Sequence, residues 1–144
     1  MRSMALDVGD RRIGIALSDE TGTLASGLET LDRVGPRQDV RAVAALAATH
    51  GVAEVVVGLP RNMDGSLGPR AQKTLAFMDA LRAGLRAELV PWDERLTSVM
   101  ARRLLREAGT RGRRRKGTVD RAAAVLILQS YLDHRKAAVG GPAD

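Results

Sequence analysis

The sequence predicts a layered α/β domain built on a mixed sheet, with the first three strands antiparallel and the remainder parallel. Short apolar runs joined by tight turns open the chain, and a β-branched run lies at its centre. Helical spacing of apolar residues separates the later strands. Strands that alternate with helices pair in parallel and carry helices on both faces of their sheet.

The first three strands are predicted from the opening apolar runs. Residues 4–9 form one run that contains a single carboxylate, and residues 12–18 form a second. A turn at Thr21-Gly22 then leads to a third strand over residues 24–31. Because the connections are short, we expect an antiparallel meander.

Helices and strands alternate in the rest of the chain. Apolar spacing predicts helices over 38–50 and 71–86, with Pro69 in the first turn of the second one. The β-branched run within 54–60 predicts a strand buried on both faces, and 88–92 predicts a short last strand. Two more helices are expected, from Thr97 or Ser98 through Ala108 and from Thr118 through about Lys136.

Length and composition limit the class of protein. A chain of 144 residues predicts one domain, over 1–136, followed by a flexible tail over 137–144. The absence of cysteine excludes disulfides, thiolate metal sites and a cysteine nucleophile. No apolar run approaches the roughly 20 residues of a membrane span, and no signal peptide is evident. We therefore expect a cytoplasmic protein that does not enter membranes.

Acidic residues far apart in the sequence predict a metal site. Asp7 stands in the middle of an apolar strand, which costs several kcal/mol unless the carboxylate is paired or bound to a metal. Asp93 and Glu94 follow the last strand, and Asp120 opens the last helix. If the first strand is central and the last strand lies beside it, these carboxylates meet at one end of the sheet. Hard divalent cations prefer such oxygen ligands, and two of them about 4 Å apart support phosphodiester cleavage.

The later acidic residues also have structural explanations. Asp120 can complement the dipole of its helix, and Asp93 or Glu94 can pair with Arg95. Asp7 has few such explanations, so its functional interpretation is the strongest of the four.

Basic residues gather just before Asp120, in a chain whose formal net charge is +6. A run of this kind can be a solvated arm, but here the densest positive charge borders the expected metal site. Arginines that grip phosphates beside carboxylates that hold metal suit a nucleic-acid substrate, bound in a strongly salt-dependent way. The basic residues of the run are Arg111, Arg113, Arg114, Arg115 and Lys116.

Ordered motifs across residues 4 to about 133 resemble the bacterial YqgF/RuvX family. They are Leu6-Asp7-Val8-Gly9, Arg12-Ile13-Gly14-Ile15-Ala16, Ser18-Asp19, Val57-Gly58-Leu59-Pro60 with Asp64-Gly65, Asp93-Glu94-Arg95-Leu96-Thr97, and Asp120-Arg121-Ala122-Ala123-Ala124 with Ile127-Leu128-Gln129. The resemblance implies an RNase H-like three-layer fold related to the RuvC resolvases. It also implies Asp7, Glu94 and Asp120 as catalytic ligands of Mg²⁺ or Mn²⁺. Strand alternation does not decide between Glu94 and Asp93, which remains the alternative. Where the family often has Lys after the last Asp, this chain has Arg121.

Arginines near the expected carboxylates have two interpretations. Arg12 and Arg95 can hold the scissile phosphate, or they can pair with Asp7 or Glu94 in the protein without metal. We expect Arg12 and Arg95, together with the basic run, to contact nucleic acid.

The resemblance implies a metal-dependent endonuclease acting on structured RNA or branched DNA. Trimming the 5′ end of the 16S rRNA precursor is the favoured activity, with a ribosomal particle as a candidate partner. Resolution of Holliday junctions is the first alternative and needs a homodimer, whereas RNA trimming needs only a monomer. The second alternative is a non-catalytic RNA-binding factor that assists ribosome assembly. Asp7-x-Gly9-x4-Gly14 also resembles the phosphate loop of actin-like kinases, but that architecture needs two such domains.

Overall fold

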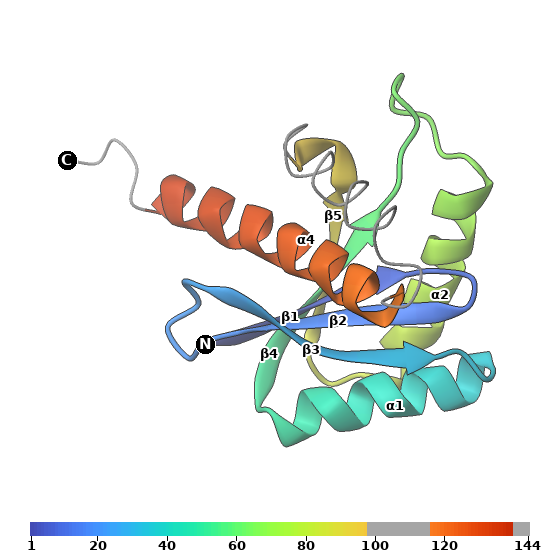
Figure 1. Cartoon of the computed structure of the whole chain (residues 1–144), viewed down its shortest axis with the longest axis horizontal. Helices are drawn as coiled ribbons and strands as arrows, with labels where there is room; N and C mark the ends of the chain where they lie inside the picture. Colours follow the sequence, from blue (N-terminus) through green and yellow to red (C-terminus); the bar gives the residue numbers. More distant parts are fainter. Residues whose placement is uncertain (98–115, 140–144) are drawn as a thin grey trace.

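The computed structural model describes residues 1–97 and 116–139, and within the last helix the side chains of residues 121–138. Figure 1 shows five strands wrapped between helices. In chain order the elements are β1 (Arg2–Val8), β2 (Arg12–Ser18), β3 (Ala25–Asp32), α1 (Pro36–Thr49), β4 (Val52–Leu59), α2 (Pro69–Gly84), β5 (Glu88–Asp93), the 3-10 turn η1 (Glu94–Leu96) and α4 (Lys116–Val139).

The five strands form one mixed sheet in the order β3-β2-β1-β4-β5. β1 is antiparallel to β2 and parallel to β4, β2 is antiparallel to β3, and β4 is parallel to β5. The predicted fold class is therefore confirmed. One expectation about strand order was wrong, because β4 separates the central strand β1 from the last strand β5. Any contact between residues of β1 and β5 must cross β4.

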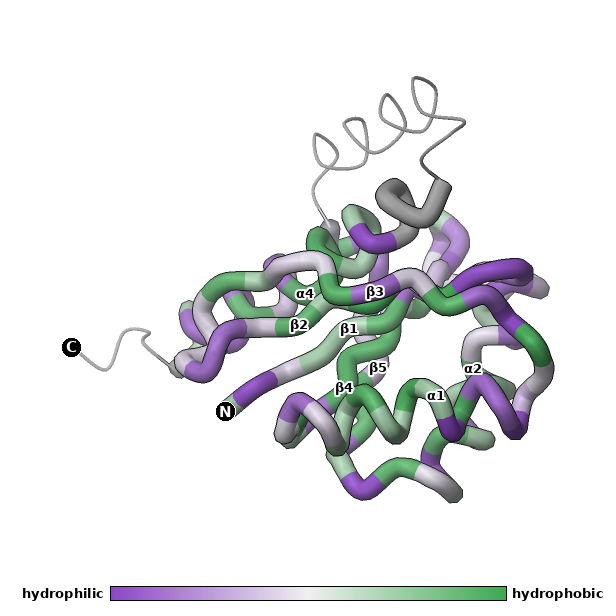
Figure 2. The backbone as a smooth tube through the Cα atoms, turned by 60° about the horizontal axis from the view of Figure 1, so that its bottom comes forward, coloured by the Kyte–Doolittle hydropathy of each residue, from purple (hydrophilic) through white to green (hydrophobic). Residues whose placement is uncertain are grey.

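Helices cover both faces of the sheet, as Figure 2 shows for the apolar strands that run between them. Successive strand residues point to opposite faces, so the two faces carry different cores. Leu6, Ile15 and Val57 pack with residues of both helices, such as Val43 of α1 and Met78 of α2. On the other face the shared core is contributed by the strands and α4, and comprises Ala5, Ala16, Val56, Trp92, Ala124, Ile127, Leu128 and Leu132.

The predicted elements agree with the observed ones to within a few residues, with two differences near the end of the chain. α4 ends at Val139 rather than near Lys136, so it continues into the expected tail, and it begins at Lys116. The helix expected from Thr97 or Ser98 through Ala108 falls almost wholly outside the described residues. In the part of the chain that the structure describes, no helix is long and apolar enough to cross a membrane.

Polar contacts fix α4 on the sheet. The Gln129 side chain accepts a hydrogen bond from the Ala25 backbone N (2.9 Å) and donates one to the Thr23 carbonyl (2.9 Å). Nearer the start of α4, Arg121 Nη1 donates to Thr30 Oγ1 (3.3 Å). These bonds set the register of α4 along β3. Apolar packing alone would define that register only loosely.

Glu54 anchors the second half of α4 from β4. Its carboxylate is almost fully buried and accepts hydrogen bonds from Ser3 Oγ (2.6 Å) and the Tyr131 hydroxyl (2.8 Å), and it pairs with Arg135. A buried carboxylate is tolerated only when it is paired in this way. The Glu54 cluster therefore locks helix, β1 and β4 together at the end of the sheet opposite to Asp7.

Candidate active site

Asp7 lies near the carboxyl end of β1, on the face that α4 covers. Ala5, two residues earlier on the same side of the strand, packs against α4, and Gly14 on β2 is the direct partner of Asp7. The side chain is half-buried rather than enclosed in the core. Its carboxylate therefore points to the helix-covered face at a place where the neighbouring strand contributes no side chain.

Glu94 reaches the same face from the far side of β4. It begins η1 directly after β5, and its carboxylate lies over Gly58 of β4. A Cβ built on Gly58 would stand 2.8 Å from Glu94 Oε1 and 2.5 Å from Ile127 Cδ1 of α4. The next position along the pairing of Leu6 with Val57 places Gly58 beside Asp7. The missing side chain at Gly58 thus lets Glu94 extend over β4 toward Asp7.

Asp93 is engaged elsewhere, by two arginines. Its carboxylate accepts a bond from the Arg95 backbone N (2.9 Å) and bonds from Arg95 Nε and Nη2, the shortest of them 2.7 Å. Arg61 Nε lies 3.9 Å away. The side-chain hydrogen bond from Arg95 is the largest of the effects that hold the pKa of Asp93 below its usual value. Of the two adjacent carboxylates, Glu94 is the one that faces Gly58.

Asp120 lies near the start of α4, and its side chain is outside the described part of the chain. The next residue, Arg121, packs on Gly27 and bonds to Thr30. Thr30 pairs with Gly14, which pairs with Asp7. The first turns of α4 therefore lie over the same end of the sheet as Asp7, as the orange start of the helix in Figure 1 illustrates.

The turn that follows Asp7 is held from behind by Arg33. Arg33 Nη1 donates to the Gly9 carbonyl (3.0 Å), its Nε donates to Asp39 Oδ2 (3.2 Å), and its guanidinium stacks 5.0 Å from the centre of the Phe77 ring. Burial alone would raise the pKa of Asp39, but hydrogen bonds from the Val34 N, Arg33 and the Gly35 N outweigh it and lower that pKa. The turn between β1 and β2 is thereby tied to α1.

The expected nucleic-acid contacts divide into three groups. Arg12 begins β2 on the same face as Gly14, beside the expected carboxylates. Arg95 donates hydrogen bonds to the carboxylate of Asp93. The side chains of the basic run Arg111, Arg113, Arg114, Arg115 and Lys116 lie outside the described residues.

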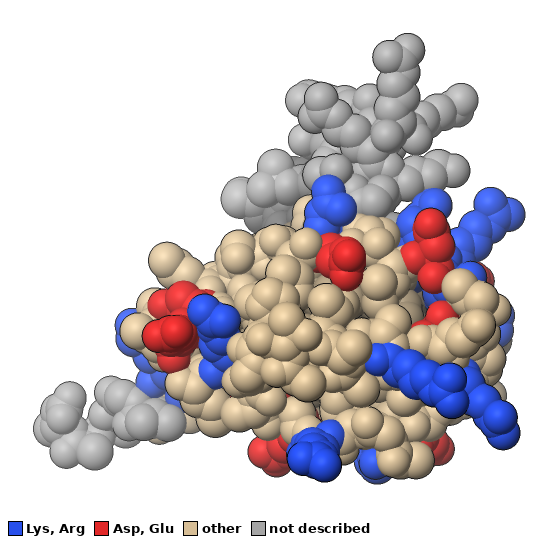
Figure 3. All heavy atoms as spheres, turned by 90° about the horizontal axis from the view of Figure 1, so that it is seen from below, with Lys and Arg blue, Asp and Glu red and all other residues tan. Residues whose placement is uncertain are grey.

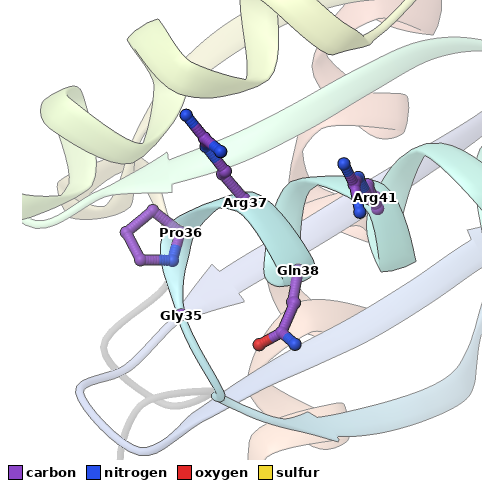
Figure 4. A pocket seen from close by; sticks show the side chains of 5 residues that line it. All are labelled: Gly35, Pro36, Arg37, Gln38 and Arg41. Carbon is purple, nitrogen blue, oxygen red and sulfur yellow. The ribbon is translucent and has the colours of Figure 1, made fainter.

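The described surface has a basic region (Figure 3) and a hollow at the start of α1. Figure 3 shows lysine and arginine side chains gathered toward the right of the view, the end at which Figure 1 places the β1–β2 turn and the start of α1. Figure 4 shows a hollow at the start of α1, from which Arg37, Gln38 and Arg41 project. Its lining contains no carboxylate, and α1 covers the face of the sheet opposite to Asp7. This hollow therefore lacks the donors of a metal site.

The donor set fits a hard divalent ion. Asp7 and Glu94 would supply carboxylate oxygens, which Mg²⁺ and Mn²⁺ prefer, and the lack of a side chain at Gly58 lets Glu94 lie over β4. Among the described residues, no three His, Cys, Asp or Glu side chains form a group that could hold a metal ion. A third carboxylate would therefore come from outside these residues, and Asp120 is the one that the sequence predicts.

Sequence reasoning missed two parts of this region. It did not predict that Glu94 and Ile127 approach Gly58, although a glycine within a β-branched strand signals a close approach of other atoms. It also missed Arg61, which joins Arg95 at Asp93. No sequence pattern links Arg61 to Asp93, because the two residues meet only through the pairing of β4 with β5.

Comparison with known proteins agrees with this architecture. The RuvX Holliday junction resolvase family matches residues 1–134. A Halothermothrix orenii protein named "Putative pre-16S rRNA nuclease" is 48% identical over 135 residues, covering 94% of this chain and 96% of its own. A Desulforudis audaxviator protein of the same name is 47% identical over 136 residues, with the same coverage of both chains.

Solved structures extend the likeness to the fold. Thermus thermophilus RuvC, in complex with a Holliday junction substrate, superposes with a TM-score of 0.61 at 14% identity, covering 94% of this chain and 96% of its own. The fowlpox virus Holliday junction resolvase superposes with a TM-score of 0.57 at 13% identity, covering 93% of this chain and 99% of its own.

The mixed sheet with its central β1 and crossing α4 places this protein in the class of RuvC-like, RNase H-like folds. Within that class, the family match over residues 1–134 is specific. The chain belongs to the RuvX family.

Proposed function

We propose that this protein is a divalent-metal-dependent nuclease that hydrolyses phosphodiester bonds in structured nucleic acid, with the 5′ end of the 16S rRNA precursor as its favoured substrate. The observation that carries the proposal is the position of the Glu94 carboxylate over Gly58, beside the strand position of Asp7. Carboxylate oxygens gathered at one end of a sheet suit a divalent cation, because these are the ligands that Mg²⁺ and Mn²⁺ prefer. The name shared by the Halothermothrix and Desulforudis relatives supports the RNA substrate.

Asp7, Glu94 and Asp120 are the residues that would hold Mg²⁺ or Mn²⁺. When bound, such an ion supplies an activated water and stabilises the leaving oxygen in phosphodiester hydrolysis. Asp7 and Glu94 would contribute from strand ends, whereas Asp120 would contribute from a helix whose register is set by Arg121 and Gln129. Arg12, on the same face, would bind a substrate phosphate.

Cleavage assays test the proposal directly. Wild-type protein should cut precursor 16S rRNA with Mg²⁺ or Mn²⁺, and Asp7→Asn, Glu94→Gln and Asp120→Asn should each lose that activity. Asp79→Asn is the matched control, since Asp79 pairs with Arg82 on the exposed side of α2, and it should retain cleavage. Equal cutting by wild type and Asp7→Asn would contradict the proposal. Binding of RNA without any cutting would favour the non-catalytic assembly factor.

Holliday-junction resolution is the second candidate function. The description of the matching family and the RuvC-like fold favour it. It requires paired cuts in opposed strands and hence two copies of the site. A four-way DNA junction cut symmetrically by a dimer, with precursor RNA left intact, would select this alternative.

A further inference from the structure

The loop between β4 and α2 has a defined shape that does not depend on its most exposed side chain. Asp64 Oδ1 accepts bonds from the Ser66 N (2.9 Å) and Ser66 Oγ (2.6 Å), and Asn62 Nδ2 donates to Ser66 Oγ (2.9 Å). The backbone closes through bonds from Asn62 N to the Ser66 carbonyl and from Gly65 N to the Asn62 carbonyl. Gly65 has φ 88°, a conformation that favours glycine.

Two arginines attach this loop beside the candidate active site. Arg95 binds Asp93 with one side of its guanidinium, and its Nη1 donates to the Met63 carbonyl (3.5 Å). Arg61 Nη1 donates to the Gly65 carbonyl (3.1 Å), while its Nε lies 3.9 Å from Asp93. Asp93 immediately precedes Glu94. The loop is therefore held at a fixed place next to the carboxylate that lies over Gly58.

Met63, at the tip of this loop, is 90% exposed, whereas Met4 and Met78 are fully buried. Its side chain makes little contribution to the apolar core, although the backbone around it is ordered by hydrogen bonds. Single exposed apolar residues are common on protein surfaces. This one differs because its loop is fastened by Arg61 and Arg95, two cations that also suit the approach of a polyanion.

The aromatic residues of the chain are already committed to its interior. Phe77 and Trp92 are 4% and 8% exposed, and the Tyr131 hydroxyl is bonded to Glu54. The sequence contains no further Phe, Trp or Tyr, and the His134 ring packs against Trp92. An aliphatic side chain can make the apolar contact with a nucleobase instead, and unbranched, polarisable methionine suits insertion against an unstacked base.

We infer that the loop of residues 61–66 is a finger that contacts the nucleic-acid substrate, with Met63 packing against a base near the cleavage site. Arg95 is the positioning residue that holds the finger through the Met63 carbonyl. This inference rests on the proposed function, because it takes the substrate to lie across Asp7 and Glu94.

Fluorescence of 2-aminopurine tests the inference, because this base brightens when it loses its stacked neighbours. The probes are a four-way DNA junction with 2-aminopurine at the branch and an RNA stem with 2-aminopurine at the end of the stem. Binding is measured with Mg²⁺ in the Asp7→Asn background, so that the strand is not cut. We expect at least one probe to brighten on binding.

Met63→Ser should remove most of this brightening and weaken binding by roughly five-fold, equivalent to about 1 kcal/mol. Met63→Leu should retain both signals, because it keeps an apolar tip. Leu24→Ser is the control, since Leu24 is a 66% exposed loop residue at the opposite end of the sheet, and it should behave as the parent protein.

Two results would contradict the proposed contact between this loop and the substrate while leaving the proposed nuclease activity intact. The first is binding that leaves the 2-aminopurine fluorescence of both probes unchanged. The second is a fluorescence increase that Met63→Ser does not reduce. In both cases the protein that retains Asp7 must still show metal-dependent cleavage. Failure of that protein to bind or cut either substrate would instead contradict the proposed function itself.

Discussion

The Glu94 carboxylate lies over Gly58, 2.8 Å from the point at which any larger residue would place its Cβ. Ile127 of α4 approaches the same point to 2.5 Å. One glycine thus accommodates both an acidic side chain from the neighbouring strand and the packing of the helix that carries Asp120.

Gly58→Ala should damage both properties, and a second substitution separates them. The new methyl group must displace Ile127 and Glu94, which we expect to cost about 1 to 2 kcal/mol of stability and most of the nuclease activity. Adding Ile127→Val removes Cδ1 and relieves the first clash only. Thermal unfolding should then recover toward that of Ile127→Val alone, while cleavage stays low. Recovery of cleavage together with stability would show that Glu94 is not required where it lies.

Asp39 should make stability depend on pH in the acid range. Its pKa in the folded protein is below the usual 3.8, so the ionised form contributes stability above that value and loses it as pH falls further. The free energy of unfolding of Asp39→Asn should be lower than that of wild type by roughly 1 to 2 kcal/mol at pH 7. Denaturant titrations should show this difference shrinking below about pH 4. A difference that stays constant down to pH 2 would contradict the role of Asp39.

Tyr131 is the single tyrosine of the chain, so its ionisation can be followed by absorbance without interference from others. Burial, followed by the hydrogen bond to Glu54, raises the pKa of Tyr131 above its usual value of 10.0. The folded protein should titrate above pH 10, and Glu54→Gln should move the midpoint down because it removes the adjacent negative charge. Circular dichroism checks that both proteins stay folded. A midpoint at or below 10 in folded wild type would contradict the buried Glu54 cluster.

The basic run should set the salt dependence of binding. Replacing Arg113, Arg114 and Arg115 with serine should reduce the slope of log affinity against log salt by about one for each phosphate that the protein no longer neutralises. Arg82→Gln is the control, since Arg82 pairs with Asp79 on the exposed side of α2. Fluorescence anisotropy with an RNA stem at several salt concentrations measures the slope. Equal slopes for the wild type, the triple serine variant and Arg82→Gln would show that the basic run is a solvated arm that does not contact the RNA.

Much of the fold was predictable because apolar periodicity is a local property. The run around Val56 identified a fully buried strand, and helical spacing identified α1, α2 and α4. The order of strands was less accessible, because pairing depends on contacts across the chain. The expectation that the last strand lies beside β1 failed for this reason, and the actual neighbour, β4, supplies Gly58.

The candidate site was predictable in its residue types but not in its orientations. A carboxylate within a core strand identified Asp7, yet the choice between Asp93 and Glu94 depended on where β5 ends. In the structure Asp93 pairs with Arg95 and Arg61. Arg61 belongs to the loop of residues 61–66, which the sequence pattern identifies only as polar. Glu54 was missed because a carboxylate early in a strand gives no sign of the helix residues that pair with it.

Binding of Mn²⁺, followed by electron paramagnetic resonance, tests the central claim most directly. Titration of wild-type protein should show bound ion, Asp7→Asn and Glu94→Gln should each weaken binding at least roughly ten-fold, or about 1.4 kcal/mol, and Asp93→Asn should bind as wild type does. Unchanged Mn²⁺ affinity in both Asp7→Asn and Glu94→Gln would contradict the assignment of these carboxylates to a metal site.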